Sequence, residues 1–496
     1  MSPSSHNETP SWMRRHGTML LTIVLSLLFL VANSLCLVHD NYYISYLPLA
    51  ILAMLFFVVR IEYMFLATAL LTPFAINVAV FPEMELSMPV EPMMIVFTVL
   101  FLFRILLTRS YDRQLLRHPV MIAVIAQLTW MGITSCTSEM PLVSFKYTTA
   151  RLWFVIPFFF AAAHLFRNPS RIGHFFWCYA IGLVTVILIA TIKTLSNFSD
   201  LQTMHHVMSP FYNDHTAYGC AIAIMLPVAV YMLIATRSNR LLRLMSVAAV
   251  ALLIVGLFFS YCRAAWVSVA AAIGMYILIR MGMKLKWMAL LAAIAVGLFF
   301  TYQGDILYRM GKNHQDSSYD IADQVKSISN IATDASNLER LNRWASAFRL
   351  WSEHPVMGSG PGTYQFLYAS YQRSYQLSTI STNAGNLGNA HSEYIGPLTE
   401  QGVVGAFLVM TVFVLTFATG VRIYRTANER HTAAMALAIT LSLLTYYVHG
   451  FFNNFLDTDK LSVPFWGFTA AIVALDVYST KKPTADVKGP TQSPQP

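Results

Sequence analysis

The sequence has 496 residues, of which 56% are hydrophobic and only 11% are charged. Soluble domains carry about 25% charged residues, so this composition excludes an ordinary soluble protein and indicates a polytopic membrane protein. The net charge of +9 comes from short Lys and Arg clusters between apolar runs, a pattern typical of topology signals and not of nucleic-acid binding. The five cysteines show no C-x-x-C spacing and predict neither a zinc site nor a disulfide framework.

The first apolar run follows a polar segment, residues 1–17, that carries Arg14 and Arg15. The run is about 20 residues long and lacks a clear small-residue cleavage site, so we expect a first membrane span and not a removed signal peptide. Residues 1–17 are then expected to be a cytoplasmic N-terminal segment.

The hydrophobic pattern predicts an all-α polytopic fold. A spanning helix needs about 20 apolar residues, and this template gives about 12–14 transmembrane helices, in two blocks at residues 18–302 and 394–478. A polar insert at 303–393 separates the blocks, and the tail at 479–496 is too polar to bury a core and is expected to be disordered. The expected spans lie near residues 18–38, 44–60, 63–80, 90–107, 119–136, 147–166, 174–193, 217–235, 245–262, 264–280, 287–302, 394–420, 432–450 and 461–478.

The segments between these spans alternate between basic and poorly basic. The positive-inside rule places the basic set and both termini in the cytoplasm. It places four other segments together on the outer face, and acidic, histidine and aromatic residues gather in them. We therefore expect the chemistry on that face. The four outer segments are residues 81–91, 194–216, 303–393 and 451–460.

The apolar run at residues 245–280 predicts a break at Arg263. One helix of about 36 residues would be about 54 Å long, whereas the hydrocarbon layer is about 30 Å thick. An arginine at membrane depth costs about 2.5–3.5 kcal/mol on insertion scales. Arg263 is therefore either an interfacial side chain that reaches the headgroups or a ligand for an anion such as a lipid phosphate, whose oxygens suit the planar guanidinium group.

The insert contains a predicted amphipathic helix, residues 337–353. Ser336 and Glu339 have the spacing of a capping box, and Pro355 ends the helix. The apolar residues recur at helical spacing and form one arc, which predicts a helix on the outer membrane surface with tryptophans at the interface. The arc comprises Leu338, Leu341, Trp344, Ala345, Phe348 and Trp351.

Two arginines of this helix differ in their expected directions. Arg340 borders the apolar arc in the early turns, where the helix dipole favours anions, while Arg343 is expected to point further into solvent. Arg340 is thus the better candidate for a phosphate ligand. The alternative is that both belong to an ordinary solvated face of a packing helix.

The segment from Pro355 to Tyr364 is rich in glycine but matches neither phosphate-loop pattern, so a turn is its default structure. His391 lies where the insert re-enters the membrane. Its neutral imidazole is able to accept a proton from a hydroxyl group, although histidines at such boundaries are often hydrogen-bonded anchors. Further outer-face candidates are His205, His206, Asp214 and His215, and the pair Asp457 and Asp459, whose D-x-D form would suit a hard divalent metal.

Four pieces of the sequence occur together and in order: FYNDHTAYGCAIAIMLP, FSYCRAAWVSVAAA, ERLNRW followed by HPVMGSGPGTYQF, and NAHSEYIGPLTEQGVVGAFL. Their combination resembles the O-antigen ligase and polymerase superfamily of bacterial envelope proteins. The resemblance covers roughly residues 210–470, whereas the first two hundred residues look like generic membrane helices.

The resemblance implies a GT-C-like membrane fold with a large periplasmic loop domain. Members of the superfamily move a glycan from undecaprenyl diphosphate to a hydroxyl group at the periplasmic face of the inner membrane. The acceptor is the lipid A core in ligases and another glycan in polymerases. Two departures stand beside the resemblance: the expected span count is somewhat larger than the family usually shows, and the choice between Arg340 and Arg343 stays open.

The resemblance also assigns roles. The family's essential arginines fall on Arg263 and Arg340, with Arg343 as the neighbour of the second, and these would bind the diphosphate. The essential histidine falls on His391, which would act as the base in an inverting transfer without metal or cofactor. The expected supporting residues are Asn389, Glu393, Tyr394, Asp214 and His215.

The expected partners are therefore a glycan donor linked to undecaprenyl diphosphate, a lipid A core acceptor and membrane lipids, with no nucleic acid. Overall similarity favours a ligase, with a polymerase of the same superfamily as the alternative. A flippase or transporter for a lipid-linked saccharide is a third hypothesis, but it predicts polar residues at mid-bilayer depth, and the notable cations lie at the outer edge.

Overall fold

The computed structural model describes residues 11–38, 43–48, 60–81, 84–109, 111–196, 207–291, 293–294, 297, 301, 335–377, 381 and 388–479. The chain divides into two compact units, residues 1–64 and 65–496. The described part of the first unit contains α1 (Ser11–Val38), the short 3-10 helix η1 (Tyr43–Tyr46) and the start of α3 (Ile61–Leu71).

The second unit is a helical bundle, as the apolar pattern predicts. Ten helices in the described ranges are long and apolar enough to cross a membrane. The expected span near 44–60 lies largely outside the described residues, and so do about half of the span near 287–302 and most of the tail at 479–496. The helices after α3 are α4 (Val90–Thr108), α5 (Arg113–Leu116), α6 (Pro119–Cys136), α7 (Pro141–Val155), η3 (Ile156–Ala161), α8 (Ala162–Leu165), α9 (Ser170–Ser196), α11 (His215–Ala235), α12 (Arg240–Phe259), α13 (Arg263–Arg280), α16 (Ala335–Glu353), α17 (Tyr364–Leu367), η4 (Tyr368–Tyr371), η5 (Ser374–Gln376), α18 (Ile395–Thr426), α19 (Arg430–His449) and α20 (Asp459–Tyr478).

The expected span at residues 63–80 is wrong. After α3 the chain forms the 3-10 turn η2 (Thr72–Phe74) and then the antiparallel strands β1 (Ile76–Phe81) and β2 (Met84–Met88), with Ile76 opposite Met88. Pro73 lacks the N–H that a continuing helix needs, and the following residues are largely β-branched or aromatic. A continuous apolar run hides such a hairpin, because periodicity does not separate a short buried strand from a helix.

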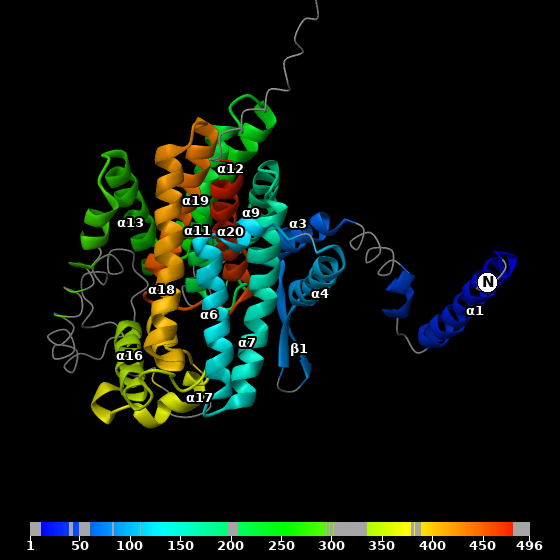
Figure 1. Cartoon of the computed structure of the whole chain (residues 1–496), viewed down its shortest axis with the longest axis horizontal. Helices are drawn as coiled ribbons and strands as arrows, with labels where there is room; N and C mark the ends of the chain where they lie inside the picture. The colour runs from blue at the N-terminus through cyan, green and yellow to red at the C-terminus, as the bar shows by residue number, and fades with distance from the viewer. Residues whose placement is uncertain are drawn as a thin grey trace, which may run out of the picture. The chain divides into compact units, whose positions relative to one another are not determined.

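The core of the bundle lies around α20. In its most apolar stretch 89% of the residues are buried, against 22% in each of α4, α12 and α13. α20 packs against α7, α11, α18 and α19 (Figure 1). Leu106 and Leu107 of α4 are 74% and 69% exposed. The outer helices therefore present apolar side chains of the kind that lipid would cover.

The predicted break at Arg263 is confirmed. α12 ends at Phe259, Tyr261 adopts a left-handed conformation with φ 48°, and α13 begins at Arg263 itself. Length alone predicted this break, because one straight helix could not fit the membrane.

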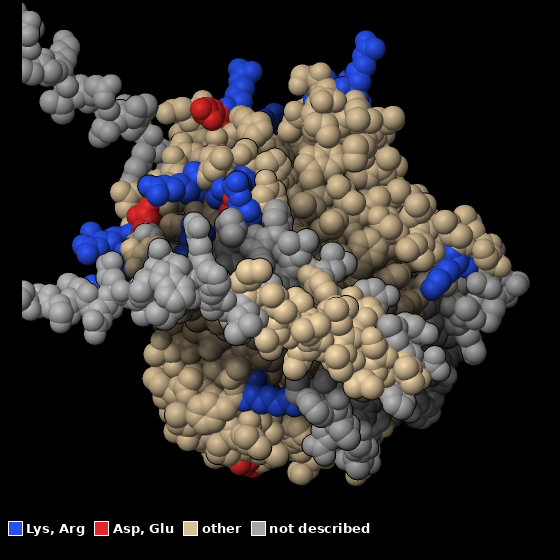
Figure 2. All heavy atoms as spheres, turned by 90° about the vertical axis from the view of Figure 1, so that its right-hand side faces the viewer, with Lys and Arg blue, Asp and Glu red and all other residues tan. Residues whose placement is uncertain are grey.

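The segments predicted for the two sides of the membrane gather at opposite ends of the bundle. The end of α18 and the turn after α13, both predicted as basic segments of one side, lie together because Arg425 Nη2 donates to the carbonyl oxygen of Met283 at 2.5 Å. In Figure 2 most of the described surface is uncharged, and the basic side chains gather mainly toward the top. At the opposite end Ser87 Oγ donates to Asp459 Oδ2 at 2.8 Å, which joins two of the segments predicted for the outer face.

Candidate active site

The insert packs onto this second end of the bundle through α16. Leu341, Trp344 and Leu350 are almost fully buried in a cluster that includes Tyr364 and Ile395. The apolar arc thus packs on the protein's own residues, whereas we had expected it to lie on the membrane surface. The reason is tertiary: the segments after α16 and before α18 fold back over the helix, and the helical period alone does not reveal this cover.

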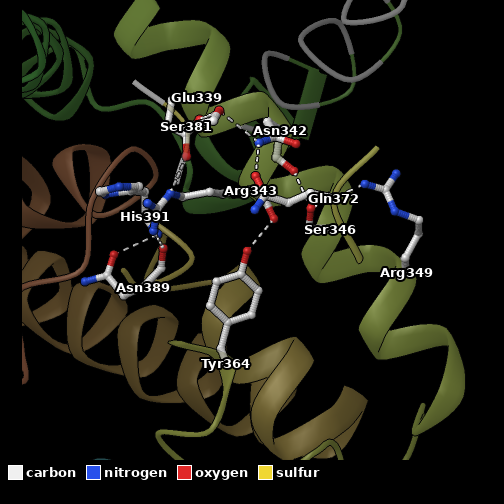
Figure 3. A network of polar contacts seen from close by, with 10 residues as sticks. All are labelled: Glu339, Asn342, Arg343, Ser346, Arg349, Tyr364, Gln372, Ser381, Asn389 and His391. Atoms are coloured by element: carbon white, nitrogen blue, oxygen red, sulfur yellow. Dashed lines mark hydrogen bonds and ion pairs between the residues drawn. The ribbon is translucent and has the colours of Figure 1, made fainter. Parts of the chain in front are cut away.

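Arg343 was expected to point into solvent, and this expectation is wrong. Its side chain is buried, Nε donates to Glu339 Oε1 at 2.8 Å and Nη1 donates to the carbonyl oxygen of Asn389 at 3.0 Å (Figure 3). Its guanidinium carbon lies 4.9 Å from the ring centre of Tyr368. A Cβ atom on Gly388 would lie 1.8 Å from Nη1, so any larger residue at this position would displace the guanidinium group. Arg343 therefore fixes α16 to the segment that carries His391.

His391 is held in a left-handed conformation with φ 50°. Histidine is among the few non-glycine residues that are enriched in this region, and the His391 N–H donates to Asn389 Oδ1 at 3.1 Å. The Ser392 Oγ then accepts from the Tyr394 N–H at 3.3 Å in the turn that precedes α18. The local sequence therefore places the imidazole where the chain turns into α18, beside the Arg343 network in Figure 3.

The environment of His391 keeps its imidazole neutral. Burial, followed by the positive charges of Arg340 and Arg343, lowers the pKa of His391 to about 3, although Asp214 acts in the opposite direction. Burial and neighbouring cations both disfavour the imidazolium form. The ring is thus able to accept a proton throughout the neutral pH range.

Arg340 and the start of α13 share this neighbourhood. Arg340 is half-buried and its Nε donates to the carbonyl oxygen of Phe452 at 3.1 Å. Burial raises the pKa of the Cys262 thiol to about 12; the charge of Asp214 contributes to the rise and that of Arg340 opposes it. Cys262 immediately precedes Arg263, which is half-buried as the first residue of α13. The charge of Arg340 therefore acts both on His391 and on Cys262, the residue that precedes α13.

Asp214 is the N-cap of α11. Its carboxylate accepts from the Thr216 N–H at 3.0 Å, from the Thr216 hydroxyl, and lies 3.1 Å from His215 Nδ1. Burial acts to raise the pKa of Asp214, but the hydrogen bonds from His215 and Thr216 outweigh it and hold the pKa well below its usual value. Asp214 is thus an ionised N-cap whose negative charge acts on His391. His205 and His206 lie outside the described residues.

Glu393 and Tyr394 hold the re-entry segment against the end of α19. Glu393 Oε1 accepts from the Tyr446 hydroxyl at 2.5 Å and from the N–H groups of Phe455 and Leu456, each at 2.9 Å. The Tyr394 hydroxyl donates to the carbonyl oxygen of Tyr447 at 2.7 Å. These side chains therefore fix the position of the segment that carries His391.

The glycine-rich segment after α16 is a turn that fills a kink in α18. Gly402 breaks that helix with φ 69° and ψ −172°. The Gly360 N–H donates to the freed carbonyl oxygen of Glu400 at 2.8 Å, and the Val403 N–H donates to the carbonyl oxygen of Pro355 at 2.9 Å. The default prediction of a turn therefore holds, and its glycines serve close packing of backbone on backbone.

The two carboxylates of the D-x-D sequence, Asp457 and Asp459, contact different parts of the protein. Asp459 is buried, lies 3.5 Å from Lys460 Nζ and accepts from Ser87, whereas Asp457 is exposed to a cavity beside the re-entry segment. The two carboxylates thus have separate surroundings. Among the described residues no three His, Cys, Asp or Glu side chains form a group able to hold a metal ion.

Sequence reasoning missed the polar side chains inside the apolar spans. Arg151 of α7 is 8% exposed, and its Nη1 donates to the carbonyl oxygen of Leu456 at 2.6 Å. Glu400 lies in α18, and its Oε1 accepts from the Tyr364 N–H at 3.1 Å. Both lie in helices long enough to span, so a charged residue within an apolar run was the available signal.

Comparison with known proteins gives one family match. A family model described as O-Antigen ligase matches residues 248–410, which include α13, α16, the glycine-rich segment and the His391 segment. A search of the curated proteins gives no match.

Proposed function

We propose that this chain, whose residues 248–410 match a family model described as O-Antigen ligase, transfers a glycan from undecaprenyl diphosphate to a hydroxyl group of the lipid A core. One observation carries this proposal. The positive charge of Arg340 acts on a neutral His391 from a distant segment, and it also acts on Cys262, the residue before Arg263 at the start of α13. A glycosyl transfer from a lipid diphosphate needs such a pair of functions, a cationic group for the leaving diphosphate and a base for the acceptor.

In this proposal Arg340 and Arg263 bind the diphosphate. Negative charge builds up on the diphosphate as the glycosidic bond breaks, so fixed guanidinium groups stabilise the transition state more than the bound donor. Arg343 does not bind the diphosphate in this proposal, because its Nε and Nη1 already donate to Glu339 and Asn389. Arg343 holds the segment that presents His391.

His391 takes the proton from the acceptor hydroxyl as that oxygen attacks the anomeric carbon from the side opposite the diphosphate. This direct displacement inverts the anomeric centre, and the bond to the diphosphate oxygen breaks as the new bond forms. Donor binding also prepares the base. The negative diphosphate would offset the charges of Arg340 and Arg343 and so raise the pKa of His391 from about 3, which strengthens it as a proton acceptor only when donor is present.

We place this end of the bundle at the periplasmic face of the inner membrane and both termini in the cytoplasm. The basic segments at the opposite end support this orientation through the positive-inside rule, and Arg425 and Met283 show that two of them lie side by side. The donor and acceptor lipids both present their glycans at the periplasmic face.

The direct test is a transfer assay with the purified full chain, a donor carrying several repeats on undecaprenyl diphosphate, and lipid A core as acceptor. We expect a product in which the glycan is joined to the core, seen by mass spectrometry. A product extended only on another carrier-linked glycan would instead make the protein a polymerase. Movement of labelled donor across proteoliposomes without any covalent product would make it a transporter.

A further inference from the structure

A cavity of about 170 Å³ lies behind the segment that carries His391, and the proposed reaction does not use it. Its wall is formed by α6, α7, α18, α20 and the loop after α19. Asn389, Ala390 and Ser392 are part of the wall, so the cavity borders both neighbours of His391 in the chain. Any molecule bound in the cavity would therefore contact the backbone on either side of His391, the proposed base.

The cavity is polar although apolar helices surround it. Arg151 and Tyr147 enter from α7, where Arg151 Nη2 donates to the Tyr147 hydroxyl at 2.9 Å. Glu400 enters from α18 and Asp457 from the loop before α20, and Asp457 is exposed to the cavity. A guanidinium group, two carboxyl groups and a phenol in one enclosed space are costly to bury unless a ligand or water completes their hydrogen bonds.

Three further wall residues carry buried polar atoms without a hydrogen-bond partner in the described part of the chain. Gln401 is 3% exposed and its Oε1 is unpaired; Trp466 is 2% exposed and its Nε1 is unpaired; Asn454 Oδ1 is the third such atom. The set contains one donor and two acceptors. A bare cation would satisfy only the acceptors and a simple anion only the donor, whereas a hydroxyl group both donates and accepts.

We propose that this cavity is a saccharide subsite, which holds one hydroxyl-bearing sugar residue of a glycan substrate beside the His391 segment. Carboxyl, amide and guanidinium groups bond the hydroxyls, and the rings of Trp466 and Phe413 in the same wall cover the apolar face of the sugar. The inference rests on the proposed function for its choice of substrate. The sugar belongs either to the carrier-linked donor or to the lipid A core acceptor.

A substitution at Gly396 would add a side chain to the cavity wall. Gly396 lines the wall at the start of α18, and a Cβ atom there would meet no other atom within 4 Å. Gly396→Leu therefore adds a side chain whose Cβ atom meets open space at the cavity wall. Gly274→Leu in α13 is the matched control, because a Cβ atom at Gly274 also meets nothing within 4 Å and the residue is exposed outside the cavity.

Asp457→Asn tests the polar contacts between the cavity wall and the sugar, since asparagine keeps the shape of the aspartate side chain and removes its negative charge. Glu139→Gln is its control: this partly exposed carboxylate pairs with His354 outside the cavity. For Gly396→Leu and Asp457→Asn we expect the KM for one substrate to rise about 10-fold, as befits the loss of a hydrogen bond to a charged group. The KM for the other substrate and both controls should stay within about 2-fold of wild type.

The kinetic measurement varies donor and acceptor separately with the full chain in nanodiscs. A raised donor KM assigns the sugar to the donor, and a raised acceptor KM assigns it to the acceptor. Unchanged KM values for both substrates in both cavity variants, with active wild type, would overturn the subsite and leave the proposed function intact.

Binding of free core oligosaccharide and free repeat oligosaccharide, followed by saturation-transfer NMR, separates the two proposals. If the wild type transfers no glycan but binds one oligosaccharide, and Gly396→Leu removes that binding while Gly274→Leu retains it, the subsite stands and the proposed function fails. If the wild type neither transfers nor binds either oligosaccharide, the cavity holds water only and the inference is overturned.

Discussion

At the scale of single residues, Arg340, Arg343 and His391 differ in what surrounds them. Arg340 and His391 are half-buried, and we propose them as the diphosphate ligand and the base, whereas Arg343 is buried and bonded to Glu339 and Asn389. The sequence predicted the residue types but not this division. A helical wheel placed Arg343 toward solvent, and only the segment at 388–391, distant in sequence, covers it.

The burial of Arg343 gives a prediction about stability. Arg343→Met removes the ion pair with Glu339, which is 5% exposed, and breaking a buried pair by removing one partner costs about 3–5 kcal/mol. We expect a large fall in the thermal unfolding temperature. The double variant Arg343→Met with Glu339→Met should recover much of the loss, because no charge is left unpaired. Equal unfolding temperatures for the single and double variants would contradict the ion pair.

A second residue-scale prediction concerns pH. The accessible surface of Asp457 faces the cavity and not bulk solvent, so desolvation first, and then the charge of Glu393, raises the pKa of Asp457 to about 6, although Arg151 opposes this. A raised carboxyl pKa means that Asp457 is already protonated below about pH 6. If the ionised form binds sugar, kcat/KM should fall as the pH drops through 6, and Asp457→Asn should remove this step. His391, with a pKa of about 3 in the free enzyme, adds no step between pH 5 and 8. A step near pH 6 that persists in Asp457→Asn would contradict this.

At the scale of elements, α18 and the glycine-rich segment form one unit. The kink at Gly402 exposes carbonyl groups that the segment then bonds, and this unit supports both the cavity and the His391 turn. The sequence predicted the helix and the turn separately. It did not predict that one fills the break in the other, because that contact joins residues about 40 positions apart and leaves no local periodicity.

The kink predicts a contrast between two glycines of α18. Gly402→Ala places a Cβ atom 2.0 Å from the Val356 carbonyl oxygen at φ 69°, so we expect a loss of about 3 kcal/mol or more and a lower unfolding temperature. Gly396→Ala lies in the same helix with open space around it and should be neutral or stabilising by about 0.5–1 kcal/mol. Similar unfolding temperatures for the two variants would be evidence against the kink.

Other elements show which features of the fold could be predicted from the sequence. The break between α12 and α13 and the helix in the insert were predictable, since length and capping residues are local signals. The β1–β2 hairpin was not, because its strands are short and continuous with an apolar run. The cavity was not either, since it is built from four helices and a loop that only folding brings together.

At the scale of the whole molecule, the account requires that α16 and the His391 segment face the periplasm. Ser352 at the end of α16 and Asn428 between α18 and α19 are both exposed, at opposite ends of the bundle. In intact cells with a permeabilised outer membrane, Ser352→Cys should react with a membrane-impermeant thiol reagent, and Asn428→Cys should react only after the inner membrane is opened. The parent chain gives the background of its own cysteines. The reverse labelling pattern would contradict the proposed orientation.

The central claim is that His391 is the base of a glycan transfer, and its most direct measurement is the rate of transfer by purified His391→Ala beside Arg373→Ala, an exposed control in the same insert. Loss of a general base typically costs 100-fold or more, so we expect kcat of His391→Ala to fall at least about 100-fold while Arg373→Ala stays near wild type. Transfer by His391→Ala at the wild-type rate would contradict the account.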